Sequence, residues 1–351
     1  MKILYVASNY IPATGGTEIS DATLLRELSK KGYETTIITY ADYESVEESR
    51  PRVFRISKRD PSCKIAELCI AERPDMIYTA LGWSRHAINM GKKFSIPSVL
   101  NVSSLEYGDK ISFGKPFAPD YLLTPSEFAK KKIFEQSGRE AEVILPCVDF
   151  SRFDKALNDP KYVTLINPVV EKGSEIFYYL VSKMPEVHFL IKAAWLNLKK
   201  RGSWDIDRLR LIAESLGDKL VIPKEQELPK YTNLTSVLDD RNISWVYNNT
   251  RILLSPSLCE ETYGMTNLEA MYHGIPVIAS NRGGIPESTG RAAILIDNPE
   301  DVIEWKNALT EVLSNKELFD RLHKESLERA NNYNLDDVIT RYELFFKKIT
   351  T

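Results

Sequence analysis

Short apolar runs alternate with amphipathic helical stretches along most of this 351-residue chain, and this alternation limits the possible folds more than any other feature. In the first half, the strand-like runs are residues 3–7, 35–39, 76–79, 98–102 and 121–124. Helical stretches at residues 17–30, 64–72 and 127–136 separate several of these runs. A strand followed by a helix and another strand favours parallel pairing, because the helix carries the chain back across the sheet. The first half is therefore predicted to form a doubly wound parallel α/β sheet.

A second series begins after residues 150–160, a polar stretch without periodicity that is typical of a linker. Its strand candidates are residues 162–166, 188–191, 219–222, 252–254, 276–279 and 293–296. Helical stretches at residues 299–313, 316–331 and 336–348 close the chain. Because 351 residues exceed one comfortable core, we predict two Rossmann-like domains, at residues 1–155 and 156–335. The terminal helix at residues 336–351 is expected to pack back on the first domain.

The overall composition excludes several classes of protein. With 43% hydrophobic and 27% charged residues the chain is typical of globular proteins, and its formal net charge of −3 gives no general attraction to nucleic acid or acidic membranes. No apolar stretch approaches the roughly 18 residues that span a bilayer, and the first seven residues fit a strand rather than a signal peptide. The basic triplet at residues 130–132 is interpreted as a solvated helix face rather than a lipid-binding patch.

The cysteines give no sign of a metal site or a disulfide framework. There are four, and their spacing matches neither a zinc motif nor a redox motif: Cys63, Cys69, Cys147 and Cys259. A reducing cytoplasm fits this usage best, so a cytoplasmic protein is expected. Asp239 and Asp240 lie in a polar stretch and are interpreted as a solvated turn rather than a metal motif.

The most informative local segment is residues 255–287. An apolar run at 252–254 ends at Ser-Pro-Ser, a loop with Glu261 follows, and a short helix is predicted over residues 266–273, with Glu269 one turn into it. In parallel sheets, ligands bind beyond the carboxyl ends of strands, where free N–H groups at helix starts hold anions. The backbone amides predicted to bind phosphate are those of Met265, Thr266 and Asn267.

The string Glu261-Thr-Tyr263-Gly264-Met-Thr-Asn-Leu-Glu269 resembles the signature of the family-4 retaining glycosyltransferases. That signature is Glu, seven residues, Glu, with an aromatic residue and a glycine after the first acid. Two acids at this spacing recur by chance, so the resemblance depends on the whole string between a strand and a helix. It implies the GT-B fold, in which two doubly wound domains face each other across a cleft.

The resemblance also implies a reaction. A sugar would pass from a nucleoside-diphosphate sugar to an acceptor with retention at the anomeric carbon, without a metal or other cofactor. Glu261 would position the donor sugar and stabilise developing positive charge, and Glu269 would accept hydrogen bonds from ribose hydroxyls. Tyr263 and Gly264 would complete the donor loop. The acceptor, whether glycan, lipid, protein or small molecule, is not specified.

Two further places match the family. Gly15 and Gly16 lie between the first strand and the first helix, where small residues let the backbone approach a diphosphate or the transferred sugar. Lys172 follows the first strand of the second domain, where the family keeps a lysine that pairs with the donor diphosphate. The leaving diphosphate gains charge in the transition state, so a cation there assists the reaction.

The chain departs from the family at two positions. Asn167 stands five residues before Lys172, where the family commonly has an arginine, and Asn supplies no positive charge. Lys192 is a candidate replacement cation. On the acceptor side, Ser103 follows the strand after which many members carry a histidine, and Ser cannot titrate near neutral pH.

Two other functional classes stay open. One is a sugar-nucleotide epimerase or hydrolase on the same scaffold, with Glu261 and Glu269 as acid and base. The other is a non-catalytic protein that binds a sugar nucleotide or a glycan. A dehydrogenase is excluded because the Gly-x-Gly-x-x-Gly fingerprint is absent, and nucleic-acid binding because no basic stripe occurs. The donor's base and sugar, the linkage and the oligomeric state stay undetermined.

Overall fold

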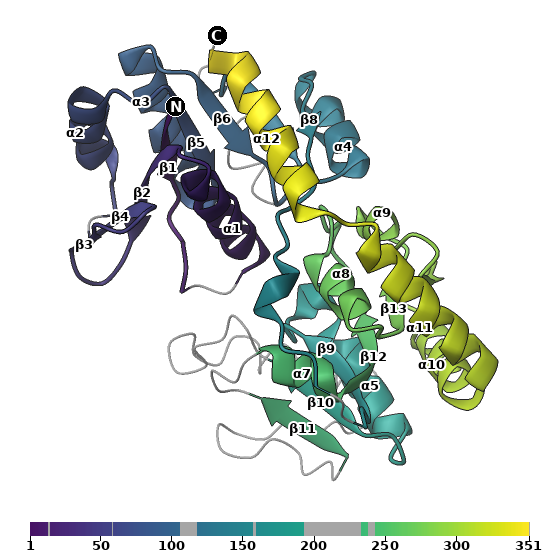
Figure 1. Cartoon of the computed structure of the whole chain (residues 1–351). Coiled ribbons are helices and arrows are strands. Elements are labelled where there is room, and N and C mark those ends of the chain that lie inside the picture. Colours follow the sequence, from purple (N-terminus) through teal and green to yellow (C-terminus); the bar gives the residue numbers. More distant parts are fainter. Residues whose placement is uncertain are drawn as a thin grey trace. The chain divides into compact units, whose positions relative to one another are not determined.

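The computed structural model describes residues 1–12, 15–57, 59–105, 118–156, 159–192, 233–237 and 243–350. The chain forms two compact units, each described by itself below (Figure 1). Unit 1 consists of Met1–Asp149, Glu261–Tyr263 and Asn334–Thr351, and unit 2 of Phe150–Glu260 and Gly264–Tyr333. Glu261, the first acid of the sequence signature, therefore belongs to unit 1, whereas Glu269 belongs to unit 2.

Unit 1 is built on an eight-stranded sheet with the order β3-β4-β2-β1-β5-β6-β7-β8. Its strands are β1 (Lys2–Val6), β2 (Glu34–Tyr40), β3 (Ser45–Glu47), β4 (Arg52–Ile56), β5 (Met76–Ala80), β6 (Ser98–Asn101), β7 (Tyr121–Thr124) and β8 (Glu142–Val143). β1 lies between β2 and β5, and both pairings are parallel. The short β3 pairs antiparallel with β4 at one edge.

Helices cover this sheet. They are α1 (Gly16–Lys30), α2 (Ser62–Glu72), the 3₁₀ turn η1 (Leu81–Trp83), α3 (Ser84–Phe94), α4 (Glu127–Ser137) and α12 (Leu335–Thr350). α1 follows β1 directly and buries Leu24, Leu25 and Leu28, as its apolar periodicity predicts. The terminal helix α12 packs on unit 1, where Glu343 accepts a bond from Lys31 Nζ at 2.6 Å.

Unit 2 is built on a six-stranded parallel sheet with the order β11-β10-β9-β12-β13-β14. Its strands are β9 (Tyr162–Ile166), β10 (Phe189–Lys192), β11 (Leu234–Val237), β12 (Thr250–Ser255), β13 (Val277–Ser280) and β14 (Ala293–Ile296). Its helices are η2 (Phe150–Arg152), η3 (Val170–Lys172), α5 (Ser174–Lys183), α7 (Ile243–Asn249), α8 (Met265–Tyr272), α9 (Ile285–Thr289), α10 (Val302–Ser314) and α11 (Lys316–Asn331). The predicted doubly wound parallel α/β class is confirmed in both units.

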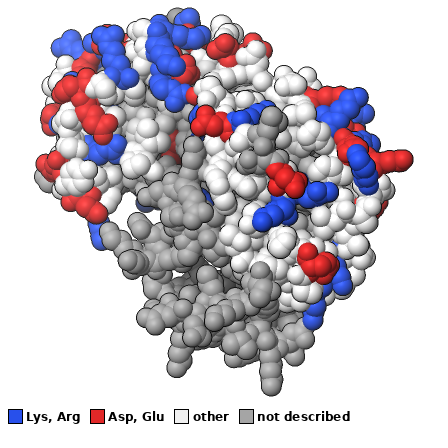
Figure 2. All heavy atoms as spheres, turned by 60° about the horizontal axis from the view of Figure 1, so that its bottom comes forward, with Lys and Arg blue, Asp and Glu red and all other residues white. Residues whose placement is uncertain are grey.

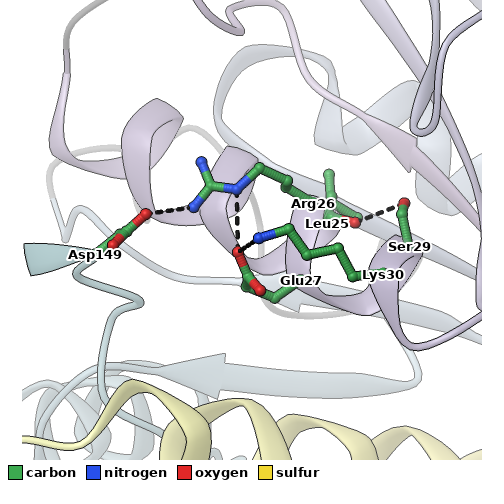
Figure 3. Close-up of polar contacts among 6 residues, drawn as sticks. All are labelled: Leu25, Arg26, Glu27, Ser29, Lys30 and Asp149. Atoms are coloured by element: carbon green, nitrogen blue, oxygen red, sulfur yellow. Dashed lines mark hydrogen bonds and ion pairs between the residues drawn. The ribbon is translucent and has the colours of Figure 1, made fainter. Parts of the chain in front are cut away.

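The stretch predicted to be a linker is packed structure instead. Residues 150–155, which we call the crossover segment, lie on unit 2: the Phe150 ring stacks on Tyr272 with centroids 4.3 Å apart, and Phe153 is only 5% exposed. The polar residues between these two phenylalanines hid the signal, because two apolar positions are too few to define a period. Asp149, just before the segment, is bonded to Arg26 of α1 at 2.6 Å (Figure 3).

Some predictions fall outside the described residues, namely the strand at 219–222 and the turn with Asp239 and Asp240. No helix in the described ranges is long and apolar enough to cross a membrane. Figure 2 shows acidic and basic side chains intermingled over the face that it presents.

Candidate active site

In unit 2 the sheet order places two of the predicted site elements side by side. β9 and β12 are neighbours in the sheet. The strand that follows β9 in the chain, β10, lies on one side of this pair, and the strand that follows β12, β13, lies on the other. Such a switch point leaves a crevice at the carboxyl ends of the two strands, where ligands of parallel sheets bind. Lys172 follows β9, and the loop leading to Glu261 follows β12. The prediction that Lys172 and Glu261 belong to one site stays a prediction.

Backbone contacts join these two loops. The N–H of Leu258 donates to the carbonyl oxygen of Glu171 at 2.9 Å, which ties the loop after β12 to η3. Gly173 has a φ of 72°, and a Cβ there would collide with the carbonyl oxygen of Pro256. Glycine is therefore the one residue that permits the left-handed turn and the close approach together.

The start of α8 has the form that an anion site needs. Gly264 precedes the helix with a φ of 87°, and a Cβ there would lie 2.9 Å from Nδ2 of Asn267. The first amides of a helix have no partner within it, so those of Met265 and Thr266 are candidate donors to a ligand. The third predicted donor differs, because the N–H of Asn267 already donates to the carbonyl oxygen of Gly264 at 3.1 Å.

Two buried polar side chains near these helix starts have no hydrogen-bond partner among the described residues. Asn267 is fully buried, and neither its Oδ1 nor its Nδ2 is bonded. Ser174, the first residue of α5, is also fully buried, and its Oγ is unbonded. An unsatisfied buried polar group costs about 1–3 kcal/mol.

Glu269 is held by two residues that the sequence did not point to. It is 5% exposed; its Oε1 accepts a bond from Arg152 Nη2 at 2.5 Å, and its Oε2 accepts one from the Tyr247 hydroxyl at 2.7 Å. Burial raises the pKa of Glu269, while Arg152 and Tyr247 act to lower it. Arg152 comes from the crossover segment and Tyr247 from α7. No local pattern signals a contact between residues 117 positions apart.

Asn167, where the resemblance leads us to expect an arginine, has a local structural role. Its φ is 59°, a left-handed conformation that Asn tolerates better than most residues. Its N–H donates to the carbonyl oxygen of Lys192 at 2.8 Å, so β9 and β10 are tied at their carboxyl ends. Lys192 itself is buried.

In unit 1, the predicted acceptor-side residue contacts both the glycine loop and the signature segment. Ser103 Oγ accepts a bond from Thr17 Oγ1 at 2.8 Å, and Thr17 follows Gly15 and Gly16. The carbonyl oxygen of Ser103 accepts a bond from Thr262 Oγ1 at 2.8 Å. Thr262 is the residue after Glu261, so the structure brings Glu261, Ser103 and the glycine loop into one neighbourhood.

Buried acids line the first helix of unit 1. Glu18, in the first turn of α1, is 2% exposed, and one of its oxygens has no partner in the described structure. Asp21 is fully buried and accepts bonds from Tyr5, Tyr78 and Asn101 at 2.7, 2.8 and 3.1 Å. Burial raises the pKa of Asp21 to about 6, against the opposing effect of these three donors. Neither acid was predicted from the sequence to belong to a site.

Within the described residues there is no group of three or more His, Cys, Asp or Glu side chains that could hold a metal ion. The expectation that the protein needs no metal stays a prediction.

Comparison with known proteins connects part of the chain to one family. Residues 179–315 match the family described as glycosyl transferases group 1. The human alpha-1,3/1,6-mannosyltransferase ALG2 is 28% identical over 189 residues, which are 48% of this chain and 44% of that protein. Sulfoquinovosyl transferase SQD2 of Arabidopsis thaliana is 25% identical over 177 residues, 46% of this chain and 34% of that protein. The matches thus span less than half the length of these relatives.

Solved structures match over nearly the whole chain. Sucrose-phosphate synthase from Thermosynechococcus elongatus has a TM-score of 0.76 at 17% identity, with 99% of each chain covered. Anabaena HepE, crystallised with UDP and glucose, has a TM-score of 0.76 at 15% identity, also with 99% of each chain covered. The chain therefore has the GT-B fold of glycosyltransferases, and across residues 179–315 it is similar to the group 1 glycosyl transferases.

Proposed function

We propose that this protein is a retaining glycosyltransferase that moves a sugar from a nucleoside-diphosphate sugar to an acceptor. The observation that carries the proposal is the switch point of unit 2, where Lys172, the loop to Glu261 and the start of α8 follow the adjacent strands β9 and β12. The similarity to group 1 glycosyl transferases supports the reaction class. The UDP and glucose bound to HepE support a nucleoside-diphosphate donor.

The leaving diphosphate would lie against unit 2. Lys172 supplies positive charge, and the amides of Met265 and Thr266 supply donors at a helix N-terminus, so charge that develops on the phosphate is stabilised. The unbonded side chain of Asn267 offers a further donor and acceptor at this helix start. Glu269, behind the same turn of α8, would accept bonds from the ribose hydroxyls.

The sugar would meet Glu261, which stabilises the positive charge that develops at the anomeric carbon as the bond to phosphate breaks. With no residue assigned as a covalent nucleophile, we propose a front-face reaction. The departing phosphate oxygen takes the proton of the attacking hydroxyl, which forms the new glycosidic bond on the face that the phosphate leaves. Ser103 and the loop of Gly15 and Gly16 would contact the acceptor or the transferred sugar.

Donor binding is tested first. A thermal-shift panel of uridine, guanosine and adenosine diphosphate sugars should yield one clear stabilising donor, because a ligand at about 100 times its Kd adds roughly 2.7 kcal/mol to the free energy of unfolding. Products are then analysed by mass spectrometry with and without candidate acceptors. A glycosylated acceptor supports the proposal.

Other outcomes would overturn it. If no donor in the panel stabilises the protein, the nucleotide-sugar site is wrong. A converted donor sugar without any acceptor would identify an epimerase, and rapid cleavage that no acceptor redirects would identify a hydrolase. Tight donor binding without any product would identify a non-catalytic binding protein.

A further inference from the structure

The crossover segment contributes a charged side chain to the second acid of the signature. Arg152 Nη2 donates to Glu269 Oε1 at 2.5 Å, and the side chains of the two residues are 27% and 6% exposed. Nothing in the motif calls for this arginine, and the segment that carries it resembles a linker in sequence. The question is whether the ion pair does more than attach the segment to unit 2.

The segment has other attachments that do not involve Glu269. Phe150 stacks on Tyr272 at 4.3 Å between ring centroids, and Phe153 packs edge-on against Tyr247 at 5.7 Å. The N–H of Asp154 donates to Ser244 Oγ at 3.1 Å. Buried aromatic rings of this kind contribute more to stability than a partly exposed ion pair does. The Arg152 guanidinium is thus an addition to a segment that is already anchored.

An ionised carboxylate has about four lone-pair positions, of which Arg152 and Tyr247 occupy one on each oxygen. The two partners fix the plane of the carboxylate, and the remaining lone pairs can accept hydrogen bonds from two neighbouring hydroxyl groups. A ribose presents such a pair in its 2′ and 3′ hydroxyls. A carboxylate that is already oriented loses less freedom when it binds them.

We propose that Arg152 is a positioning residue for the donor's ribose, holding the Glu269 carboxylate ionised and oriented toward the 2′ and 3′ hydroxyls. The inference rests on the proposed function and deepens it: it assigns the discrimination between ribose and deoxyribose to the crossover segment. The ion pair between Arg152 and Glu269 is kept when the donor binds, and the ribose hydroxyls do not displace the arginine.

The charges around Glu269 give the proposal a pH signature. Burial raises its pKa, and Arg152 and the Tyr247 hydroxyl oppose that effect. His273 faces the same helix turn, with Nδ1 3.0 Å from the Glu269 carbonyl oxygen, and burial lowers its pKa. Lys155 of the crossover segment lies over the Tyr272 ring at 3.6 Å. Loss of Arg152 would raise the pKa of Glu269 further. As the pH is lowered, Glu269 would then be protonated, and ribose recognition lost, at a higher pH than in the wild type.

The test compares ribose and deoxyribose nucleotides on matched variants. Isothermal titration calorimetry measures the Kd of UDP, GDP and ADP and of their 2′-deoxy counterparts for wild type, Arg152→Met and Arg26→Met. Arg26 is the control because it forms a similar ion pair with Asp149 at 2.6 Å, in unit 1 (Figure 3). For the nucleotide that binds best, the wild type and Arg26→Met should prefer the ribose form by about tenfold or more, the value of a hydrogen bond to a charged group.

In Arg152→Met the ribose form should bind at most about threefold more tightly than the 2′-deoxy form. As the pH is lowered, this remaining preference should be lost at a higher pH than in the wild type, because Glu269 is protonated there. An unchanged preference, or tighter binding of the ribose form, would overturn the inference while leaving the proposed function intact. If the wild type binds no nucleotide, the proposed function itself fails. Should Arg152→Met not fold, Arg152→Lys takes its place, since it keeps the charge but loses the guanidinium geometry.

Discussion

Asp21 in α1 of unit 1 and Glu269 in α8 of unit 2 are both buried carboxylates, but they are partnered differently. Asp21 in unit 1 is fully buried, and the three donors that the structure shows for it, on Tyr5, Tyr78 and Asn101, are all neutral. Glu269 in unit 2 is bonded by one neutral hydroxyl and one guanidinium. Burial raises the pKa of both acids.

The difference shows two ways in which the negative charge of a buried carboxylate can be stabilised. Neutral donors stabilise a carboxylate without cancelling its charge, so burial still raises the pKa of Asp21 to about 6, close to the physiological range. A cation such as Arg152 compensates the charge of the acid directly. If the acid is then neutralised, the cation itself is left as an unpaired charge. The acid that we expect to bind ligand is the one with the cation.

Neutralising the two acids should therefore have opposite effects at pH 7. Glu269→Gln leaves Arg152 without its anion and should cost about 2 kcal/mol of unfolding free energy, less than the roughly 3–5 kcal/mol of a fully buried pair because 27% of the Arg152 side chain is exposed. Asp21→Asn should be neutral or stabilising at that pH, since it removes a desolvated charge. Urea unfolding of both variants and the wild type measures the difference. Equal losses in the two variants would mean that the charge of Arg152 does not matter.

The pH dependence of Asp21 sharpens the same comparison. A carboxyl group whose pKa is raised in the folded state stabilises the fold below its unfolded pKa of about 4 and loses that contribution as the pH rises through about 6. Between pH 4 and pH 7 the wild type should lose on the order of 2 to 3 kcal/mol relative to Asp21→Asn. Thermal unfolding of both proteins across this range is the measurement. Parallel pH curves would show that Asp21 has an ordinary pKa.

Removal of one tyrosine hydroxyl from each acid tests the same comparison, and the smallest effect is expected for Tyr247→Phe. Tyr5→Phe should cost about 2 kcal/mol at pH 7, because it takes one of three neutral donors from a buried anion. Tyr247→Phe should cost about 1 kcal/mol, because Arg152 still compensates the charge of Glu269. The penalty of Tyr5→Phe should shrink below about pH 4, where Asp21 is protonated in both states. Denaturant midpoints compare the two variants, and a larger loss for Tyr247→Phe would reverse the interpretation.

Much of the fold could be predicted from the sequence because its signals are local. The periodicity of residues 17–30 predicted α1, and the apolar runs predicted β1, β2, β9 and β12 to within a few residues. The elements that were missed carry weak local signals. β4 interrupts its apolar residues with Arg52 and Arg55, and β11 has only four residues.

The candidate site could be predicted in part. The signature string directed attention to Glu261 and Glu269, and the glycines at 173 and 264 lie at left-handed turns that other residues rarely adopt. The partners of the acids were not predictable, because Arg152 lies in a stretch without periodicity and meets Glu269 only through the tertiary fold. The same holds for Asp21, whose three donors come from three different strands.

We propose that Glu261 acts on the reacting sugar rather than on donor affinity. The most direct test measures turnover and donor Kd for wild type, Glu261→Gln and Glu260→Gln, with the donor that the binding panel identifies. Glu260 is the exposed neighbour and has no assigned role, so its variant should match the wild type. Glu261→Gln should lose about 100-fold or more in turnover, as when a transition-state charge loses its stabilising group, while its donor Kd changes by less than about threefold. Unchanged turnover, or a loss of affinity as large as the loss of turnover, would contradict the account.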